Sequence, residues 1–186
     1  MEFKQCKGGN CTGCDGVERC FSCSTRTTKY MFYDFEATQE TGIHVVNWVD
    51  CQDFEGNIYN FETVEEFCKF VFAEKHEGYT FIAHNAKAYD AQFILKYCVE
   101  NQIKPYCIFN GTKIMMMQIE KFKIRFTDSL NFVQSALSAY PKTFGLKELK
   151  KGYFPHYFNK TCNRDYVGPK PSKKHYGYNQ MNKQKR

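Results

Sequence analysis

The sequence lacks a long hydrophobic run, and this absence excludes a protein that crosses the membrane by helices. Nowhere in the 186 residues does an apolar stretch reach about 18 residues, the length that a transmembrane helix needs. The first residues, Met1–Cys6, also lack the apolar segment of a secretory signal. We therefore expect an intracellular protein with no membrane partner, whose ten cysteines stay reduced. No internal repeat occurs, and the length fits one domain with a small appendage.

A large overall charge is also missing, but the charges that are present are unevenly distributed. The net charge is +6. Residues 141–186 carry twelve Lys and Arg against two acidic residues, whereas residues 31–140 carry nine against fifteen. A basic tail beside an acidic body fits a protein that holds a phosphate backbone near a carboxylate-lined site. A solvated tail without a partner would have the same composition, so both interpretations stay open.

Five of the ten cysteines lie within the first 23 residues. Four of them form the pattern Cys11-x2-Cys14-x5-Cys20-x2-Cys23, and thiolate pairs at this spacing can hold Zn²⁺ tetrahedrally. We predict residues 1–29 to be a loop-rich, Cys-rich appendage, because no helix or strand periodicity occurs there. A zinc knuckle and a leader with unliganded thiols are both compatible with this pattern.

Beyond Lys29 the hydrophobic pattern predicts a series of strands and helices. We expect strands at 30–36, 43–49, 57–61, 79–83, 113–117 and 121–126. We expect helices at 63–76, from about 89, at 132–140, where Pro141 should stop the helix, and at 143–149. This order predicts an α/β fold, a mixed sheet flanked by helices. Periodicity alone does not distinguish a Rossmann-like sheet from a ribonuclease-H-like one.

Two acidic residues on the first predicted strand form the first candidate site. Asp34 and Glu36 are two positions apart, so both side chains point to the same face of a strand. Two acids on one face of an apolar strand repel each other, and a divalent cation between them would offset that cost. A strand end that reaches solvent would tolerate the same two acids, so this pair alone does not decide the function.

Two further segments carry polar residues after predicted strands. Residues 84–90 read His-Asn-Ala-Lys-Ala-Tyr-Asp and lie between a strand and a helix, where α/β sheets commonly bind ligands. Asp90 falls in the first helical turn, a favourable place for a carboxylate even without a ligand. Ser129 can hydrogen-bond a phosphate or cap the next helix, and Asp128 can do either as well. Cutting a phosphodiester with two cations needs several carboxylates from separated segments, as this arrangement would provide.

Taken in order, these segments resemble motifs of family B DNA polymerases. Tyr33–Thr38 looks like the first exonuclease motif, and His84–Leu95 is similar to the second. Asp128–Leu130 and Lys147–His156 resemble two motifs of the protein-primed branch, which includes polymerases of polinton/maverick transposons, related viruses and linear plasmids. The resemblance covers residues 30–186. It implies a ribonuclease-H-like 3′–5′ exonuclease domain at residues 30–160, followed by a basic linker at 161–186 toward a polymerase region.

The resemblance also implies a role for each matching residue. Asp34, Glu36 and Asp90 would bind two Mg²⁺ or Mn²⁺ ions, and Lys151 would stabilise the scissile phosphate. The side chains that would hold the single-stranded 3′ end are Asn85, Tyr89, Ser129 and Leu130. The implied partners are single-stranded DNA 3′ ends, primer-template DNA and a terminal priming protein. The sequence departs from the pattern in one extra residue between Asn85 and Tyr89. It also has Ala37 where phage relatives often have Thr, which puts one sugar or phosphate contact in doubt.

The family pattern includes a Tyr-x-x-x-Asp motif that completes the metal site, and this sequence does not contain it. Asp165 is the last acidic residue, and Thr161 stands four positions before it. The polymerase signatures Ser-Leu-Tyr-Pro and Asp-Thr-Asp are absent too. We expect the missing motif to lie just past Arg186 in a longer protein. We also expect the 186-residue chain to add no nucleotides, to bind metal weakly and to have low exonuclease activity.

Two other functions remain open at this stage. A free-standing ribonuclease-H-like exonuclease would need the complete fourth carboxylate. A non-catalytic, zinc-containing nucleic-acid-binding module would bind zinc at its N-terminus and would show no cleavage that depends on Mg²⁺.

Overall fold

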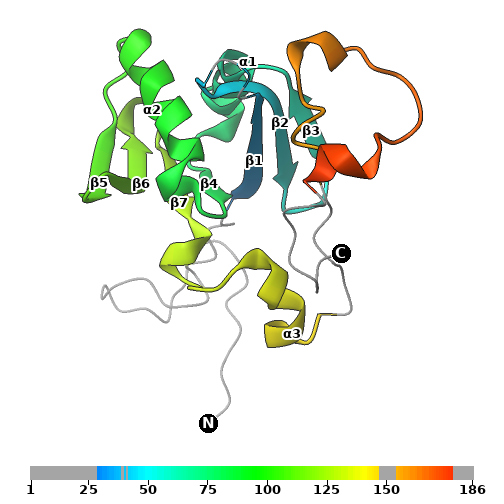
Figure 1. Ribbon diagram of the computed structural model, residues 1–186. Coiled ribbons are helices and arrows are strands. Elements are labelled where there is room, and N and C mark those ends of the chain that lie inside the picture. The colour runs from blue at the N-terminus through cyan, green and yellow to red at the C-terminus, as the bar shows by residue number, and fades with distance from the viewer. Residues whose placement is uncertain (1–28, 39, 41, 147–153, 178–186) are drawn as a thin grey trace, which may run out of the picture.

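A seven-stranded sheet forms the centre of the protein, with strand order β3-β2-β1-β4-β7-β6-β5 (Figure 1). The computed structural model describes residues 29–38, 40, 42–146 and 154–177. Its strands are β1 (Tyr30–Thr38), β2 (Val45–Asp53), β3 (Ile58–Phe61), β4 (Thr80–Ala83), β5 (Tyr106–Asn110), β6 (Lys113–Ile119) and β7 (Ile124–Asp128). Its helices are α1 (Val64–Val71), α2 (Asp90–Glu100) and α3 (Tyr140–Phe144).

The sheet is mixed, as the sequence predicts. The central strands β1, β4 and β7 run parallel to one another, while β2, β3, β5 and β6 pair antiparallel with their neighbours. Consecutive parallel strands need a crossover, and the chain supplies it with α1 between β3 and β4 and with α2 before the β5–β6 hairpin. The predicted α/β fold, a mixed sheet with helices, is therefore confirmed.

The helices α1 and α2 pack on the same face of the sheet. The ring of Phe35 on β1 lies 5.2 Å from that of Phe67 on α1 and 6.0 Å from that of Phe93 on α2. Phe67 and Ile94 are fully buried. Because side chains alternate along a strand, Met31, Tyr33 and Phe35 supply the core, while the residues between them, Asp34 included, point to the opposite face. The core face thus fixes which way the acidic residues of β1 project.

The helix α1 begins where the sequence predicts. The hydroxyl of Thr63 accepts a hydrogen bond from the backbone N–H of Glu66 at 3.1 Å, which satisfies one of the unpaired donors at the helix start. The helix ends at Val71, earlier than expected, and a single 3-10 turn, Glu74–His76, completes the predicted span. The buried His76 ring bonds the carbonyl oxygen of Phe70 at 2.6 Å and so anchors this turn.

The predicted helix at 132–140 is wrong. The chain there forms a 3-10 turn at Leu137–Ala139, and the helix α3 then begins at Tyr140 with Pro141 in its first turn. Proline is favourable in a first helical turn because the N–H it lacks has no partner there anyway. Gly145, with a φ of 63°, ends the helix, so only residues 143 and 144 of the helix expected at 143–149 are helical among its described residues. The hairpin strand β5 was not predicted.

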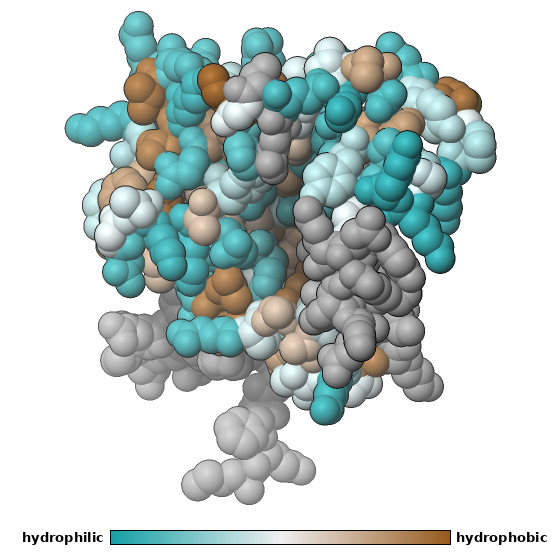
Figure 2. Space-filling view, in the orientation of Figure 1, coloured by the Kyte–Doolittle hydropathy of each residue, from teal (hydrophilic) through white to brown (hydrophobic). Residues whose placement is uncertain are grey.

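Residues 154–177 return to the sheet beside β2 and β3. The Asn159 and Asn47 side-chain amides hydrogen-bond each other, Thr161 donates to the Glu40 carboxylate, and Arg164 pairs with Glu62. In the view of Figure 2 the surface is mostly hydrophilic, with apolar side chains in small separate groups. No helix among the described residues is both long and apolar enough to cross a membrane.

Candidate functional site

The three motif segments lie at one edge of the sheet, at the carboxyl ends of three neighbouring parallel strands. β1 pairs with β4 through Phe32 and Ile82, and β4 pairs with β7 through Ala83 and Asp128. The strands β1, β4 and β7 therefore deliver the acidic segment 34–36, the segment 84–90 and the segment 128–130 to the same edge. This edge is where open α/β sheets bind ligands.

Asp90 contacts the strand that carries Asp34 and Glu36. Its carboxylate oxygen Oδ1 accepts a hydrogen bond at 3.2 Å from the backbone N–H of Phe35, the residue between the two acids. β1 extends past the last residue that it pairs with on β4, which leaves this N–H available. Asp90 is 4% exposed, whereas the side chain of Asp34 is exposed and that of Glu36 is half-buried. The structure thus brings the start of α2 against the end of β1.

The electrostatics of the site show that its carboxylates influence one another. Burial, and next the charge of Asp34, raise the pKa of Asp90 to about 7. Burial, followed by the charges of Asp90 and Glu36, also raises the pKa of the Tyr89 hydroxyl. The charge of Asp34 thus acts on Asp90 and the charge of Glu36 acts on Tyr89, and a cation bound beside Asp34 would lower the cost of ionising Asp90.

The donor set fits Mg²⁺ or Mn²⁺ in its chemistry. Asp34, Glu36 and Asp90 offer only hard oxygen ligands, and Mg²⁺ keeps several of its waters when one or two carboxylates bind it. Across the described part of the chain, however, no three His, Cys, Asp or Glu side chains are grouped closely enough to form a preassembled metal site. The Asp90 carboxylate bonds the backbone instead. The residues thus suit the metal chemically, while their coordination geometry stays a prediction.

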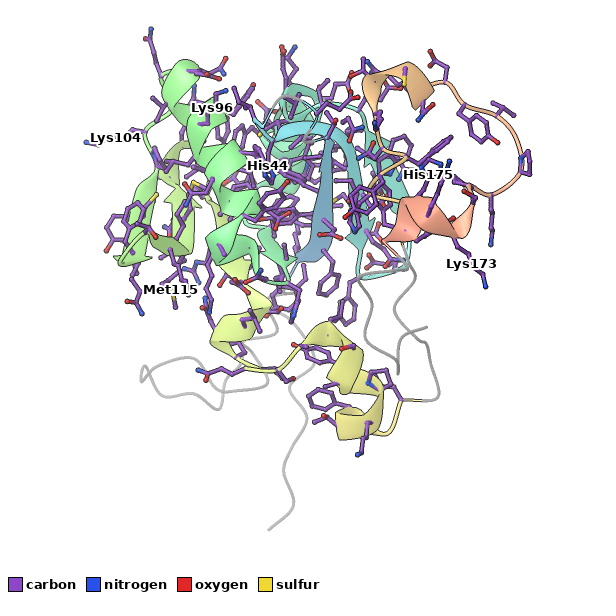
Figure 3. The ribbon with its side chains drawn as sticks, in the orientation of Figure 1. His44, Lys96, Lys104, Met115, Lys173 and His175 are labelled. Atoms are coloured by element: carbon purple, nitrogen blue, oxygen red, sulfur yellow. The ribbon has the colours of Figure 1, made fainter. Side chains whose placement is uncertain are left out.

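The segment between β4 and α2 has an unusual backbone. Asn85 is exposed and lies in the left-handed region with a φ of 68°, a conformation that Asn tolerates better than most residues. A 3-10 turn, Ala86–Ala88, follows and leads into Tyr89. The Tyr89 hydroxyl hydrogen-bonds the Nδ1 atom of His44 at 2.8 Å, and its ring meets that of Phe93 edge-on. Figure 3 shows His44 between α2 and β1. Sequence reasoning missed His44, because nothing near it in the sequence marks it.

Asp128 is a further buried carboxylate at this edge of the sheet, and the sequence leaves its role open. It is 1% exposed, and it accepts hydrogen bonds from three backbone N–H groups. These belong to Asn85 at 3.0 Å, Lys87 at 2.9 Å and Leu130 at 2.7 Å. Asp128 therefore caps the turn at residues 129–131 and holds the 84–88 segment as well. The side chain of Ser129 bonds the Nδ1 atom of His84 at 2.9 Å and joins the same two segments.

Of the remaining predicted residues, one lies at this edge of the sheet and the others lie outside the described residues. Leu130 is half-buried in the turn after β7. Lys151 lies outside the described residues, and so do the four cysteines of the proposed zinc knuckle, Cys11, Cys14, Cys20 and Cys23. Their roles stay predictions.

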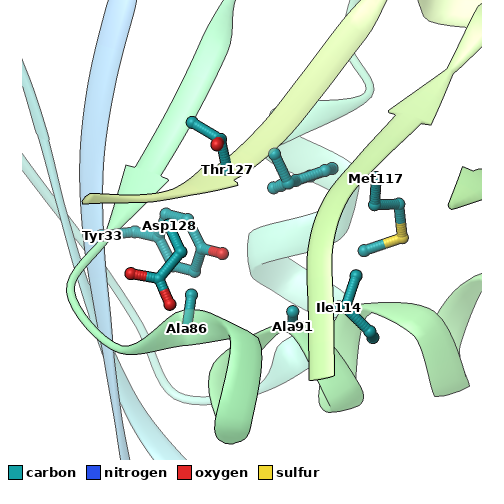
Figure 4. A pocket seen from close by; sticks show the side chains of 8 residues that line it. Tyr33, Ala86, Ala91, Ile114, Met117, Thr127 and Asp128 are labelled. Atoms are coloured by element: carbon teal, nitrogen blue, oxygen red, sulfur yellow. The ribbon is translucent and has the colours of Figure 1, made fainter. Parts of the chain in front are cut away.

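A small cavity lies beside Asp128 on the core side of the site (Figure 4). Its lining consists of Tyr33, Ala86, Ala91, Ile114, Met117, Phe126, Thr127 and Asp128. The hydroxyl of Tyr33 is buried and has no hydrogen-bond partner among the described residues. Burial, with the charges of Asp90 and Asp128, raises the pKa of this hydroxyl.

Comparison with known proteins places this sequence in a family. Residues 73–186 match the family described as DNA polymerase type B, organellar and viral. The chain is also 30% identical over 103 residues to a probable DNA polymerase of Agaricus bitorquis. That similarity covers 53% of this chain and 13% of the relative.

Solved polymerase structures share the fold. Phi29 DNA polymerase complexed with primer-template DNA and incoming nucleotides matches with a TM-score of 0.62 at 20% identity, over 81% of this chain and 28% of that one. The family B DNA polymerase of the archaeon Pyrobaculum calidifontis matches with a TM-score of 0.54 at 14% identity, over 74% and 22%. The chain therefore spans less than a third of the length of these relatives.

These matches confirm the likeness to protein-primed family B polymerases that the ordered motifs imply. The family match covers more than half of the sequence and includes the 84–90 and 128–130 segments of the site. The chain belongs to the organellar and viral type B DNA polymerases.

Proposed function

We propose that the described residues form the core of a ribonuclease-H-like 3′–5′ exonuclease domain, the proofreading part of a protein-primed DNA polymerase. The observation that carries this proposal is the contact between Asp90 at the start of α2 and the backbone of Phe35 between Asp34 and Glu36. It brings the Asp90 carboxylate against the strand that carries Asp34 and Glu36, more than fifty positions earlier in the sequence. Such convergence is what cleavage assisted by two cations requires.

Each residue of the site has a task in this reaction. Asp34, Glu36 and Asp90 would hold the divalent cations. When bound, these cations activate water and offset the charge that develops on the departing 3′ oxygen. Asn85, which lies exposed in a left-handed turn, would contact a sugar or phosphate of the DNA strand through its side-chain amide. Tyr89, whose hydroxyl hydrogen-bonds His44, would contact the DNA strand next to Asp90. Ser129, Leu130 and Lys151 would complete the contacts to the 3′ end.

The substrate is proposed to be the 3′ end of single-stranded DNA, delivered from a primer-template. Solved complexes of Phi29 DNA polymerase contain primer-template DNA and single-stranded DNA. The basic composition of residues 141–186 suits a path for the phosphate backbone. A terminal priming protein and an intracellular location belong to the same proposal.

Cleavage of a 5′-labelled single-stranded oligonucleotide tests the function. With Mg²⁺ or Mn²⁺, the wild-type chain should shorten the labelled oligonucleotide stepwise from its 3′ end. Asp34→Ala should reduce the rate by at least about 100-fold, equivalent to about 2.7 kcal/mol of barrier. An oligonucleotide with a phosphorothioate at its 3′ terminus should resist cleavage.

Binding of the same oligonucleotide should be measured in parallel, because this chain lacks the Tyr-x-x-x-Asp motif and slow turnover is expected. Wild type should bind a free 3′ end more tightly when Mg²⁺ is present, and Asp34→Ala should lose that increment. Equal cleavage and equal Mg²⁺-dependent binding by the two proteins would overturn the assignment of the site.

A further inference from the structure

The loop that carries the proposed DNA contacts is held in place by one buried side chain that lies on a different strand. Asp128 ends β7, and its two carboxylate oxygens together accept three backbone N–H groups. Oδ1 accepts from Asn85 and from Leu130, and Oδ2 accepts from Lys87. Two of these donors are the backbones of residues whose side chains are proposed to touch DNA.

The conformation of this loop needs such a restraint. Asn85 has a left-handed backbone, which costs free energy for a residue other than glycine, and Tyr89 has φ −142° and ψ −75°, outside helix and strand. No side-chain hydrogen bond caps α2 at Tyr89. Without an acceptor, the N–H groups of Asn85 and Lys87 would also be left partly buried and unpaired. The carboxylate of Asp128 meets both needs together.

The ends of β4 and β7 also connect the two segments that are proposed to contact DNA. Ala83 and Asp128 are directly opposite in the β4–β7 ladder, so each strand ends at the same level. One position further, His84 and Ser129 are joined by their side chains at 2.9 Å. A change in the position of Asp128 would thus move the 84–90 segment relative to 129–130.

We propose that Asp128 is a positioning residue of the exonuclease site, which sets Asn85 and Leu130 for the DNA strand and directs α2 so that Asp90 meets β1. This inference rests on the proposed function. Asp128 touches neither the metal nor the DNA in this role, and it acts through the backbone of the loop.

The substitution Asp128→Asn tests this role, because Asn keeps the shape but replaces one acceptor oxygen by a donor. At least one of the three N–H groups then loses its partner. We expect the KM for single-stranded DNA to rise about tenfold and kcat to fall by up to about 100-fold, because small displacements of reacting groups have effects of this size. Loss of folded molecules alone would lower the apparent kcat and leave KM unchanged.

Ile124→Val is the matched control. Ile124 is fully buried at the opposite end of the same strand, so this variant weakens β7 without touching the loop. It should keep the wild-type KM and kcat at a temperature where both variants are folded. An Asp128→Asn protein whose KM stays at the wild-type value, like that of Ile124→Val, would overturn the proposal.

Amide hydrogen exchange of the wild-type chain provides a measurement that needs neither activity nor a variant. The N–H groups of Asn85, Lys87 and Leu130 should exchange at least about tenfold more slowly than unprotected amides, although they lie in loops. Fast exchange at all three would show that the hydrogen bonds to Asp128 do not form in solution. If these amides are protected but wild type and Asp34→Ala cleave alike, the proposed function fails, and with it the role of Asp128 in positioning the exonuclease site.

Discussion

At the scale of single residues, the buried carboxyl of Asp90 should make the stability of the metal-free protein depend on pH. Burial and Asp34 raise its pKa from 3.8 to about 7. The folded state therefore binds the proton more tightly than the unfolded state does. Stability contributed by protonated Asp90 is complete below about pH 4 and is lost as the pH rises toward 7. The loss at pH 8 would be about 4 kcal/mol at most.

Thermal unfolding without divalent cations, at pH 5 and pH 8, measures this effect. Asp90→Asn keeps an oxygen for the Phe35 N–H but cannot ionise, so the variant should gain the most stability over wild type at pH 8 and less than half as much at pH 5. Other titrating groups, such as His76, contribute equally to both proteins. Asp165→Asn, which changes an exposed carboxylate, is the control and should leave the thermal stability unchanged at both pH values. A pH-independent difference between Asp90→Asn and wild type would contradict the shift.

The hydroxyl of Tyr33 should be a net cost to the fold. It is buried without a partner among the described residues and lies near the Asp90 and Asp128 charges. Tyr33→Phe keeps the ring contacts with Phe67 and Phe126 and removes the unpaired oxygen. We expect the variant to be more stable by roughly 1 kcal/mol in urea unfolding. A less stable variant would show that the hydroxyl is hydrogen-bonded in solution.

At the scale of elements, the first turn of α1 depends on a single cap. Thr63→Ala removes the acceptor for the Glu66 N–H and should lower the free energy of unfolding by about 1 kcal/mol. Thr63→Ser retains a hydroxyl and should restore most of it. Urea denaturation of the three proteins provides the comparison. Equal losses in both variants would mean that the methyl group of Thr63, and not its hydroxyl, supports the helix.

The success of sequence prediction differed among elements for physical reasons. β1 and α1 were predictable because buried positions recur at the strand and helix periods, as in Tyr33 and Phe35. β5 was not predicted because it lies at the edge of the sheet. There Tyr106, Ile108 and Phe109 are largely exposed, so the sequence shows no alternation of buried and exposed positions. The helix expected before Pro141 failed because proline can open a helix as well as stop one.

The site shows the same division. The pairing of Asp34 with Glu36 follows from residue type and spacing, the role predicted for Asp90 follows from the family resemblance, and the structure brings their elements together. The part of Asp128 was not predictable, because its three partners are backbone N–H groups that every residue except proline carries. The contact of His44 with Tyr89 joins residues 45 positions apart and depends on the chain path after β1. Sequence therefore indicates the proposed metal ligands more readily than the residues that hold their segments in place.

At the scale of the whole molecule, the uneven charge predicts how DNA binding responds to salt. Residues 141–186 are strongly basic, and the rest of the described body is acidic, so phosphate contacts should come mainly from the basic part. Lys173 and Lys174 lie in a 3-10 turn on the β3 side of the sheet, while Lys104 lies at the far side near β5 (Figure 3). Binding that neutralises phosphates weakens with salt in proportion to the contacts made.

The double substitution Lys173→Gln and Lys174→Gln separates specific phosphate contacts from general attraction. If both lysines contact phosphates, the slope of log affinity against log salt should become shallower by about 1.4, since each contact on a single strand contributes about 0.7. The control pair Lys104→Gln and Lys113→Gln removes the same charge from the acidic body and should leave the slope unchanged. Fluorescence anisotropy of a labelled oligonucleotide over a salt series measures both. Equal slopes in the two pairs would mean that net charge alone, without a defined path along residues 173–174, attracts the DNA.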